Sequence, residues 1–345
     1  MNVRIEEVAN AAQVSTATVS RALNNLPGVG QQTREHVLKV ALELGYSPSH
    51  SASALASGTS HSIGIVLPDV SRWFLATAVQ SIEMALHERH YDALIYTLPD
   101  DEGKPRPTFN PTVLRSKVDA VAVLSVYFSE QEVELLKSLN LPVAFLSVRQ
   151  PGFSHVGIDD EAAMRSACEN LIAHGHRIIG HLSGMTNDTC PNAPTERRRR
   201  AWKAMLGRHG LECSDSLDSP ARVMTAQHGY EAAKILLNRR PDVTAIVASS
   251  DEMAMGAIQC LRERSLTPGV DVAVIGIDGN NLSEAFGLTT VAQPVYEQSM
   301  ALVTILLAAL AGDTAHRELI FPTHLIARNS TARQHVDIAH ALQGG

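Results

Sequence analysis

The 345-residue sequence predicts an α/β protein, in which a small all-helical head precedes a larger domain of two doubly wound lobes. Two observations carry this prediction. Residues 1–48 place apolar side chains at helical spacing, whereas from Ser62 onward short apolar runs alternate with longer helical stretches. Continuous apolar strands separated by helices are typical of parallel sheets that helices cover on both faces.

The composition is that of a folded protein with a sizeable core. Hydrophobic residues make up 45% of the chain, which excludes wholesale disorder and leaves room for more than one domain. No apolar run is long enough to span a bilayer, and early charges at Arg4, Glu6 and Glu7 argue against a signal peptide. Four cysteines stand far apart: Cys168, Cys190, Cys213 and Cys260. We therefore expect free thiols in a reducing cytoplasm, and no membrane partner, metal or cofactor.

Residues 14–23 predict a short helix capped by Ser15, whose hydroxyl can accept a hydrogen bond from an unpaired N–H of the first turn. Val19, Ala22 and Leu23 recur at helical spacing and give this helix one buried face. A preceding helix carries a matching apolar stripe: Ile5, Val8, Ala9 and Ala12. Two short helices joined by a tight turn form a helix-turn-helix, whose second helix fits the DNA major groove. By spacing alone, one corner of a small helical bundle explains the pattern equally well.

A third helix is predicted over residues 31–44, and Gly45 stands where a glycine would end it. Together the three helices make a head of residues 1–48. Residues 49–60 are rich in serine and alanine, a composition typical of a flexible linker. The charge argues against a nucleic-acid ligand, because the chain has a net charge of −7 and DNA affinity depends on neutralising phosphates.

Residues 61–335 predict two similar lobes, each built around a doubly wound sheet. Strand-like runs occupy residues 63–67, 93–96, 120–124, 143–146, 178–182, 245–248 and 272–277. Helical stretches occupy residues 74–89, 130–139, 162–173, 195–209, 229–238 and 253–264. Late segments are predicted to cross between the lobes: a strand at 288–292, a helix at 295–311, and strands near 319–321 and 325–327. The first lobe is assigned residues 61–158 and 290–318, and the second lobe residues 159–289 and 319–333.

Polar and aromatic residues follow several predicted strands, at the sheet edge where doubly wound folds bind ligands. Ser71, Trp73 and Phe74 come after the first strand, and the two rings either stack on a sugar or anchor the next helix in the core. Asp251 and Asp278 end later strands, where a carboxylate either accepts hydrogen bonds from ligand hydroxyls or caps a helix. A cleft between the lobes is therefore the predicted small-molecule site.

Residues 5–9, 14–24 and 44–48 resemble the start of the LacI/GalR (lactose-repressor) family of bacterial transcription regulators. The resemblance continues along nearly the whole chain. It implies a periplasmic-binding-protein-like effector domain, and a homodimer that binds a pseudo-palindromic operator in double-stranded DNA. The implied DNA-binding residues of the head are Ser15, Thr16, Ala17, Thr18, Ser20, Arg21 and Asn24. Thr16, Ala17 and Arg21 are expected to read bases, with Arg21 suited to a bidentate guanine contact, while Thr18, Ser20 and Asn24 hold phosphates.

In this family the segment after the head is a hinge helix, which pairs with its twin in the minor groove and wedges a leucine between base steps. Leu55 holds that position in this chain. So short a helix is unstable alone, and we expect it to fold only against its partner and the duplex. The sequence departs from the family pattern at Gln13, Ser49 and Ser53, where a glycine, an asparagine and an arginine are usual.

The resemblance also implies contacts to a sugar or polyol effector. Arg198 stands three residues before Ala201-Trp202, where the family carries an effector-binding arginine whose fork suits vicinal hydroxyls or an acidic group. Arg72-Trp73 replaces the Asn-Pro that is usual in the family. The implied effector-binding residues are Ser71, Trp73, Phe74, Arg198, Ser250, Asp251, Asp278 and Gln293.

The predicted function is ligand-responsive transcription regulation, with repression as the expected direction. Enzyme functions are disfavoured because the chain has no dinucleotide-binding glycine motif after a strand, no P-loop and no nucleophile elbow. His87 and His90 are one residue too close for a zinc-binding helical pair. The alternative is a small-molecule (sugar) binding protein without a DNA-binding role, which would not shift duplex DNA.

Overall fold

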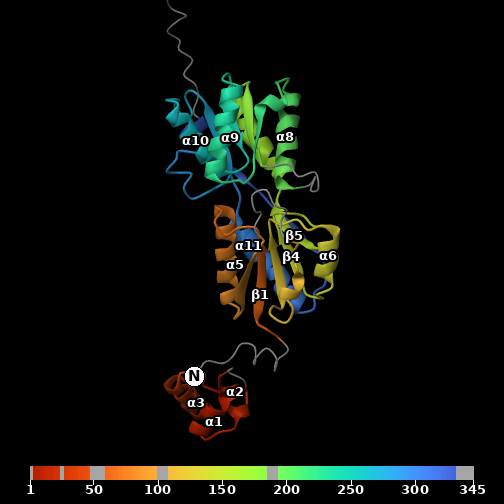
Figure 1. The fold of residues 1–345 in the computed structure, drawn as a ribbon, viewed down its shortest axis with the longest axis vertical. Coiled ribbons are helices and arrows are strands. Elements are labelled where there is room, and N and C mark those ends of the chain that lie inside the picture. Colours follow the sequence, from red (N-terminus) through yellow and green to blue (C-terminus); the bar gives the residue numbers. More distant parts are fainter. Residues whose placement is uncertain (1–2, 24–26, 47–58, 99–107, 185–192, 332–345) are drawn as a thin grey trace, which may run out of the picture. The chain divides into compact units, whose positions relative to one another are not determined.

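The chain divides into two compact units, Met1–His61 and Ser62–Gly345. The computed structural model describes residues 3–23, 27–46, 59–98, 108–184 and 193–331 of them (Figure 1). The predictions for Asn24, for Leu55 and for most of the 49–60 linker concern residues outside these ranges. Within the described ranges, no helix combines the length and the apolar character needed to cross a membrane.

The first unit is a head of three helices: α1 (Ile5–Ala11), α2 (Thr16–Leu23) and α3 (Gln31–Leu44). The predicted apolar faces are confirmed, since Val19 and Val37 are fully buried in one shared core. Ser15 caps α2 as predicted, because its Oγ accepts a hydrogen bond from the Thr18 N–H at 3.1 Å. Gly45 ends α3 with a φ of 68°, a left-handed backbone that glycine adopts without a Cβ clash.

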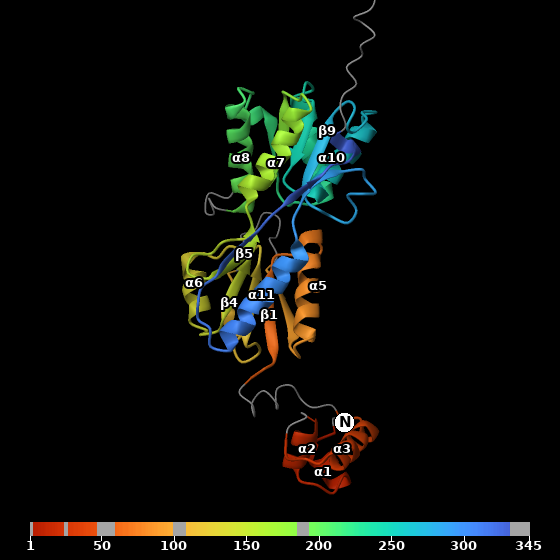
Figure 2. The same cartoon turned by 180° about the vertical axis from the view of Figure 1, so that it is seen from behind.

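The first sheet of the second unit contains six parallel strands in the order β11-β5-β4-β3-β1-β2. They are β1 (Ser62–Leu67), β2 (Asp92–Thr97), β3 (Ala120–Leu124), β4 (Val143–Leu146), β5 (Ser154–Ile158) and β11 (Glu318–Phe321). Helices α5 (Trp73–His87) and α11 (Val295–Leu310) pack together on one face (Figure 2), and α6 (Glu130–Lys137) covers the other. Strand β1 serves both cores, because Ile63 and Ile65 face α5 and α11 whereas Val66 faces the side of α6.

The second sheet has the order β12-β10-β9-β8-β6-β7, and only its edge strand β12 is antiparallel among the described residues. Its strands are β6 (Ile179–Gly184), β7 (Asp218–Ala221), β8 (Ala245–Ala248), β9 (Ala273–Asp278), β10 (Thr289–Ala292) and β12 (His324–Ile326). Its helices are α7 (Asp160–Ala173), α8 (Pro194–Arg208), α9 (Ala226–Arg239) and α10 (Asp251–Glu263). The fully buried indole of Trp202 is the largest side chain in the core of this lobe.

Two strands, β5 and β7, are not predicted by the apolar pattern, because polar residues interrupt it. Ser154 and His155 of β5 and Asp218 and Ser219 of β7 are buried all the same. The other predicted strands and helices form, with small shifts at their ends.

The predicted division of residues between the lobes is wrong at two places. Residues 290–292 lie in β10, which pairs with β9 and β12 of the second sheet, and residues 319–321 lie in β11, which pairs with β5 of the first sheet. The chain therefore crosses between the lobes after β5, after β10 and between β11 and β12 (Figure 2). An apolar run shows that a strand forms, but it does not show which strand is its neighbour.

Candidate functional site

A cavity of about 190 Å³ lies between the two lobes of the second unit. The first lobe contributes Arg72, Phe74, Ser125, Tyr127, Ser147 and Val148. The second lobe contributes, among others, Thr195, Arg198, Met224, Asp278 and Gln293. A neighbouring cavity of about 460 Å³ shares Arg72, Ser125, Thr195 and Met224 with it, so the two form one continuous cleft.

The fold brings these residues together because parallel strands end at the same edge of each sheet. Ser125 follows β3, Ser147 follows β4, and Asp278 is the last residue of β9. Arg72 stands at the start of α5 and Arg198 in the first turns of α8, both of which begin at this edge. The lining is therefore polar and convergent, which is the character of a site for a small hydroxylated or charged molecule.

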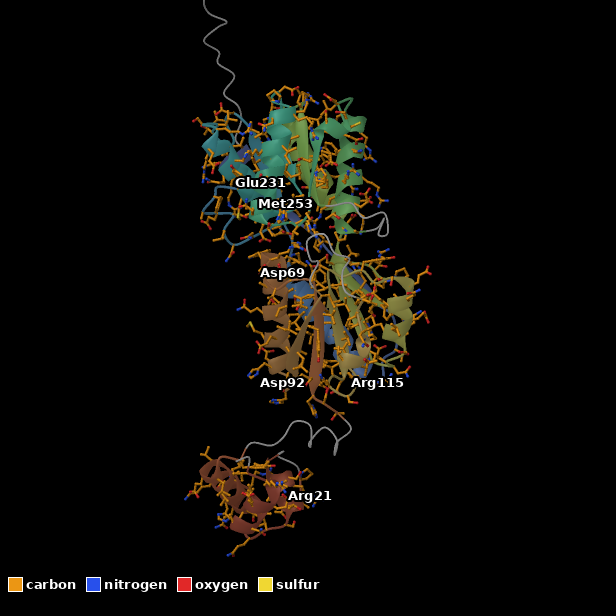
Figure 3. The ribbon with its side chains drawn as sticks, viewed as in Figure 1. Arg21, Asp69, Asp92, Arg115, Glu231 and Met253 are labelled. Carbon is orange, nitrogen blue, oxygen red and sulfur yellow. The ribbon has the colours of Figure 1, made fainter. Side chains whose placement is uncertain are left out.

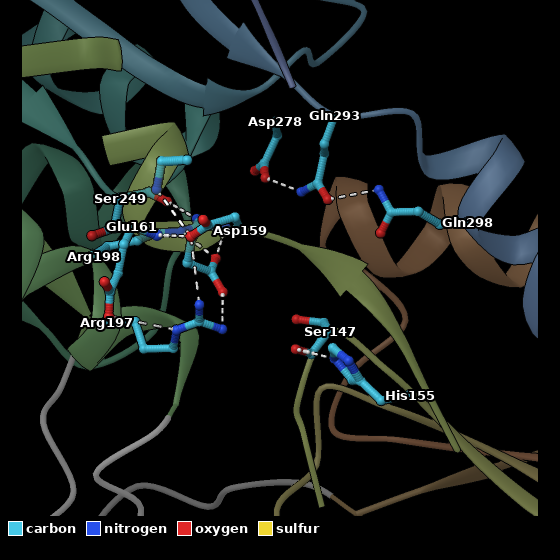
Figure 4. Close-up of polar contacts among 12 residues, drawn as sticks. Ser147, His155, Asp159, Glu161, Arg197, Arg198, Ser249, Asp278, Gln293 and Gln298 are labelled. Carbon is cyan, nitrogen blue, oxygen red and sulfur yellow. Dashed lines mark hydrogen bonds and ion pairs between the residues drawn. The ribbon is translucent and has the colours of Figure 1, made fainter. Parts of the chain in front are cut away.

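Arg198, the arginine singled out from the sequence, lines the cavity but is already held by protein atoms (Figure 4). Its Nε and Nη2 each lie 2.9 Å from Oδ1 of Asp160, and its Nη1 donates to the carbonyl oxygen of Ser249. Both Arg198 and Asp160 are buried, with 5% and 3% of their surface exposed. Most of the guanidinium fork thus fixes the start of α7 to the end of β8.

Asp278 and Gln293 form the second polar feature of the cleft. Gln293 Nε2 donates to Asp278 Oδ1 at 2.8 Å, and Gln298 Nε2 donates to Gln293 Oε1 at 3.1 Å, which fixes the orientation of the Gln293 amide (Figure 4). Burial raises the pKa of Asp278 to about 7, and the nearby Arg198 charge only partly opposes this. Near neutral pH the Asp278 carboxyl can therefore both donate and accept hydrogen bonds.

Asp278→Asn is expected to stabilise the protein at alkaline pH more than at acidic pH. The unfolded Asp carboxyl titrates near 3.9, so the folded protein holds this proton more tightly and its stability falls as the pH rises toward about 7. Asparagine carries no charge, and its oxygen can still accept the hydrogen bond from Gln293. Urea denaturation at pH 5 and pH 8 should show a gain in unfolding free energy that is larger at pH 8 by about 2 kcal/mol. An equal difference at both pH values contradicts the raised pKa.

Phe74, Arg198, Asp278 and Gln293 are the four predicted effector residues that line the cavity, and the other four do not. Ser71 is exposed and its N–H and Oγ donate to Asp69, at 2.8 and 2.7 Å. Trp73 packs against the first-lobe core, so of the aromatic pair only Phe74 faces the cavity. The Trp73 N–H donates to Oε2 of Glu252 at 3.3 Å, a direct contact between the lobes.

Ser250 and Asp251 have structural roles. Ser250 caps α10 by accepting a hydrogen bond from the Met253 N–H at 3.3 Å. The Asp251 carboxylate is fully buried and accepts four hydrogen bonds, at distances between 2.7 and 3.0 Å. Its donors are the backbone N–H groups of Gly279 and Asn280 and the hydroxyls of Ser283 and Thr290.

The residues that line the cavity but are absent from the sequence prediction include Arg72, Ser125, Tyr127, Ser147 and Met224. A positional signal existed for two of them, since Ser125 and Ser147 directly follow predicted strands. Both adopt a positive φ, of 53° and 76°. Arg72 was visible as a departure from the family pattern, although not as a site residue.

Three buried polar side chains in the second lobe, those of Ser249, His181 and Asp218, lie in a row behind Arg198. His181 Nε2 is 3.0 Å from Ser249 Oγ, and His181 Nδ1 is 3.2 Å from Asp218 Oδ1. Burial by itself raises the pKa of Asp218, but its contacts with His181 and Arg199 bring it down to about 2. The order Ser-His-Asp resembles a hydrolase triad. All three side chains are buried, however, so Ser249 Oγ is not accessible to a substrate. These contacts instead support Ser249, whose carbonyl oxygen accepts the hydrogen bond from Arg198.

The head presents one face of α2 to solvent. Thr16, Ala17 and Arg21 are exposed, as is Ser15 before them, whereas Thr18 and Ser20 are half-buried. Figure 3 shows the Arg21 side chain on the surface of this unit.

The turn before α2 and the end of α2 are held by two further residues. Gln13 has a φ of 54° in the turn, so the position where the family usually has glycine does require a left-handed backbone. Arg34 Nη1 donates to the carbonyl oxygens of Arg21 and Ala22 and so satisfies the end of α2, where a cation is favourable.

Comparison with known proteins matches both units. Residues 4–49 match the family described as bacterial regulatory proteins, lacI family, and residues 168–331 match the periplasmic binding protein-like domain. The chain is 32% identical to catabolite control protein A of Priestia megaterium, over 96% of this chain and 100% of that protein. It is 30% identical to the HTH-type transcriptional regulator DegA of Bacillus subtilis, over 96% of this chain and 99% of that one.

Solved structures agree with the sequence comparison. A complex of the transcriptional regulator CelR with cellobiose is 28% identical with a TM-score of 0.70, covering 95% of this chain and all of that one. The lac repressor dimer bound to operator and the anti-inducer ONPF is 25% identical with a TM-score of 0.82, covering 96% and 100%. A sugar-binding protein without a DNA-binding role is therefore not the correct interpretation of the sequence. Full-length similarity to named regulators, together with the matched head, shows that the chain belongs to the lacI family of bacterial regulatory proteins and is a DNA-binding transcription regulator.

Proposed function

We propose that this regulator binds a pseudo-palindromic operator as a homodimer, and that a hydroxylated small molecule between its lobes controls operator binding. One observation carries the proposal: the same chain holds a helix-turn-helix with an exposed second helix and a polar cavity between two lobes. The similar lac repressor structure is a dimer on its operator, and the similar CelR structure holds cellobiose. A symmetric dimer requires an operator with two inverted half-sites.

The exposed side chains of α2 are the proposed base readers. Thr16, Ala17 and Arg21 all face solvent. Thr16 and Ala17 lie in the first turn of α2, the part that reaches base edges in the major groove, and Arg21 lies in its last turn. Ser15, Thr18, Ser20 and Asn24 are the proposed phosphate contacts. The head carries no net charge, so the salt dependence of operator binding is expected to be shallow.

Arg21→Ala is expected to weaken operator binding by about 10- to 100-fold, because a bidentate arginine–guanine contact contributes about 1–3 kcal/mol. The measurement is a gel-shift titration on a duplex that the wild-type chain selects from a random library. Arg115→Ala is the matched control, since Arg115 is an exposed arginine of the second unit (Figure 3). Equal affinity of Arg21→Ala and wild type would remove Arg21 from base readout. Failure of the wild-type chain to select any inverted repeat would contradict the proposed operator.

Effector binding is proposed to act through closure of the cleft. Phe74, Arg198, Asp278 and Gln293 line it from both lobes, so a ligand that touches all four favours one spacing of the lobes over another. A change in that spacing would favour or disfavour the hinge helix proposed for residues 49–60. We also propose that the regulator works in the cytoplasm and catalyses no reaction.

Leu55→Ala is expected to weaken operator binding by at least tenfold while leaving effector affinity unchanged. The leucine is the proposed minor-groove wedge, and without it the bent duplex loses its apolar insertion. Operator affinity by gel shift and effector affinity by calorimetry, measured on the same preparation, test the prediction. If operator affinity is unchanged, the hinge wedge is not part of the mechanism.

A further inference from the structure

The cleft contains an arginine, Arg72, that forms no ion pair with any of the residues that the structure describes. Arg72 stands at the start of α5, lines both cavities, and is half-buried. Its Nε is buried and has no hydrogen-bond partner within the part of the chain that the structure describes. No carboxylate of the described residues forms an ion pair with its guanidinium either. This sets it apart from Arg198, whose Nε and Nη2 both meet Asp160.

The acidic groups near Arg72 are engaged elsewhere. Asp278 Oδ1 accepts from the Gln293 amide, and Glu252 Oε2 accepts from the Trp73 N–H. The Asp69 carboxylate accepts hydrogen bonds from the N–H and the hydroxyl of Ser71. These carboxylates attract Arg72 through space, and Arg198 repels it, but none of them contacts it. A guanidinium whose buried Nε has no acceptor and no contacting anion is costly, and such cost is typical of a site that a ligand completes.

A second positive feature faces the same cavity. Helix α8 begins there, since Ala193, Pro194 and Thr195 line it, and no side chain of the described residues caps this end. The first turn of a helix presents unpaired N–H groups and carries a partial positive charge, which favours an anion. Two independent observations, the unpaired arginine and the uncapped helix, thus point to negative charge on the occupant.

We propose that the effector is a hydroxylated anion, whose carboxylate or phosphate pairs with Arg72 while its hydroxyl groups meet Asp278 and Gln293. This inference rests on the proposed role of the cleft as the effector site. The guanidinium fork suits either anion, because both present two oxygens in one plane to paired N–H donors. Sugar acids and sugar phosphates are the two compound classes with this chemistry.

The test uses the full chain and matched sets of sugars. The midpoint of thermal unfolding is measured with four neutral sugars: D-glucose, D-galactose, D-mannose and D-ribose. Each sugar is compared with its aldonate and its terminal phosphate, and each hexose also with its uronate. We expect stabilisation by acidic members and none by their neutral parents. The carboxylate and phosphate arms identify which anion the site takes. The affinity of each hit is then measured by calorimetry.

Variants of Arg72 decide whether that residue is responsible. Arg72→Gln is expected to weaken binding of the acidic hit by about 100-fold and Arg72→Lys by about tenfold, because lysine keeps the charge but not the fork. Arg200→Gln is the matched control, since this arginine lies on α8 with its side chain half exposed and does not line the cleft. Thermal unfolding of each variant without ligand confirms that it is folded.

The outcomes separate this inference from the proposed function. Binding of a neutral sugar alone, or undiminished binding of an acidic sugar by Arg72→Gln, overturns the anionic effector and leaves the cleft as the effector site. If no neutral sugar, sugar acid or sugar phosphate stabilises the protein, the hydroxylated effector itself is contradicted, and with it both proposals. The inference is supported if Arg72→Gln no longer binds an acidic sugar that both the wild type and Arg200→Gln bind.

Discussion

Arg198→Ala is expected to lower the free energy of unfolding of the second unit by about 3–5 kcal/mol, in addition to removing the effector response. The substitution leaves the carboxylate of Asp160, which is 3% exposed, without the guanidinium that meets it through two nitrogens. It also removes the donor to the carbonyl oxygen of Ser249. Breaking one side of a buried ion pair is costly because the remaining charge stays desolvated. Urea denaturation followed by circular dichroism measures the change.

The control for this prediction lies two residues further along the same helix. Arg200 faces Glu161 at 3.8 Å with half of its side chain exposed, so Arg200→Ala should change stability by less than about 0.5 kcal/mol. In Arg198→Ala the Asp160 carboxylate keeps only the longer contact with Arg197 Nη1, at 3.7 Å, among the described residues. The double variant Asp160→Ala with Arg198→Ala should therefore be more stable than Arg198→Ala alone. Equal stability of Arg198→Ala and wild type would mean that the pair is not formed in solution.

Asp251→Ala is expected to cost a similar amount, about 3–5 kcal/mol of unfolding free energy. The carboxylate accepts four hydrogen bonds that tie the start of α10 to the loop after β9 and to β10. Alanine removes the acceptor of the Asn280 N–H and of the Ser283 and Thr290 hydroxyls, whereas the Gly279 N–H keeps Thr290 Oγ1 at 3.1 Å, and each unsatisfied group carries its own desolvation penalty. Asp251→Asn should cost less, because the amide oxygen can still accept from part of the set.

The matched control is Glu231→Ala on the exposed face of α9 (Figure 3). This glutamate contacts only Gln227 within its own helix at 3.3 Å among the described residues, so its loss should change stability by less than about 0.5 kcal/mol. Denaturation curves of the wild type and the three variants at one pH provide the comparison. A fully stable Asp251→Ala variant that loses ligand binding would return Asp251 to the effector site.

The helices and most strands could be predicted because their signal is local. Val19 and Val37 recur at helical spacing, Ser15 and Gly45 mark helix ends, and the apolar run of β1 reads as a buried strand. The strands β5 and β7 could not be predicted in this way. Their buried polar residues are stabilised by partners on or next to neighbouring strands. His155 contacts the carbonyl oxygen of Ser147 after β4, and Asp218 contacts His181 of β6.

The candidate site was only partly predictable, because similar local patterns serve different roles. Asp251 opens α10 shortly after β8, and Asp278 is the last residue of β9, so both follow an apolar run in the sequence. One organises the lobe, however, and the other lines the cleft. Trp73 and Phe74 are neighbours in sequence, and only Phe74 faces the cavity. Sequence spacing places such residues at the correct edge of the sheet. Sequence spacing does not show which donors on other strands form hydrogen bonds with these residues.

The helical head, the alternation of strands and helices, and the family of the chain could all be inferred from the amino-acid order, because these depend on local periodicity and on motifs. The folded structure was needed to find where the chain crosses between the lobes, that Arg198 is already paired, and that Arg72 Nε has no partner among the described residues. The physical reason is that strand neighbours and counter-ions come from distant parts of the chain. Whether a charge is free to bind a ligand depends on those partners.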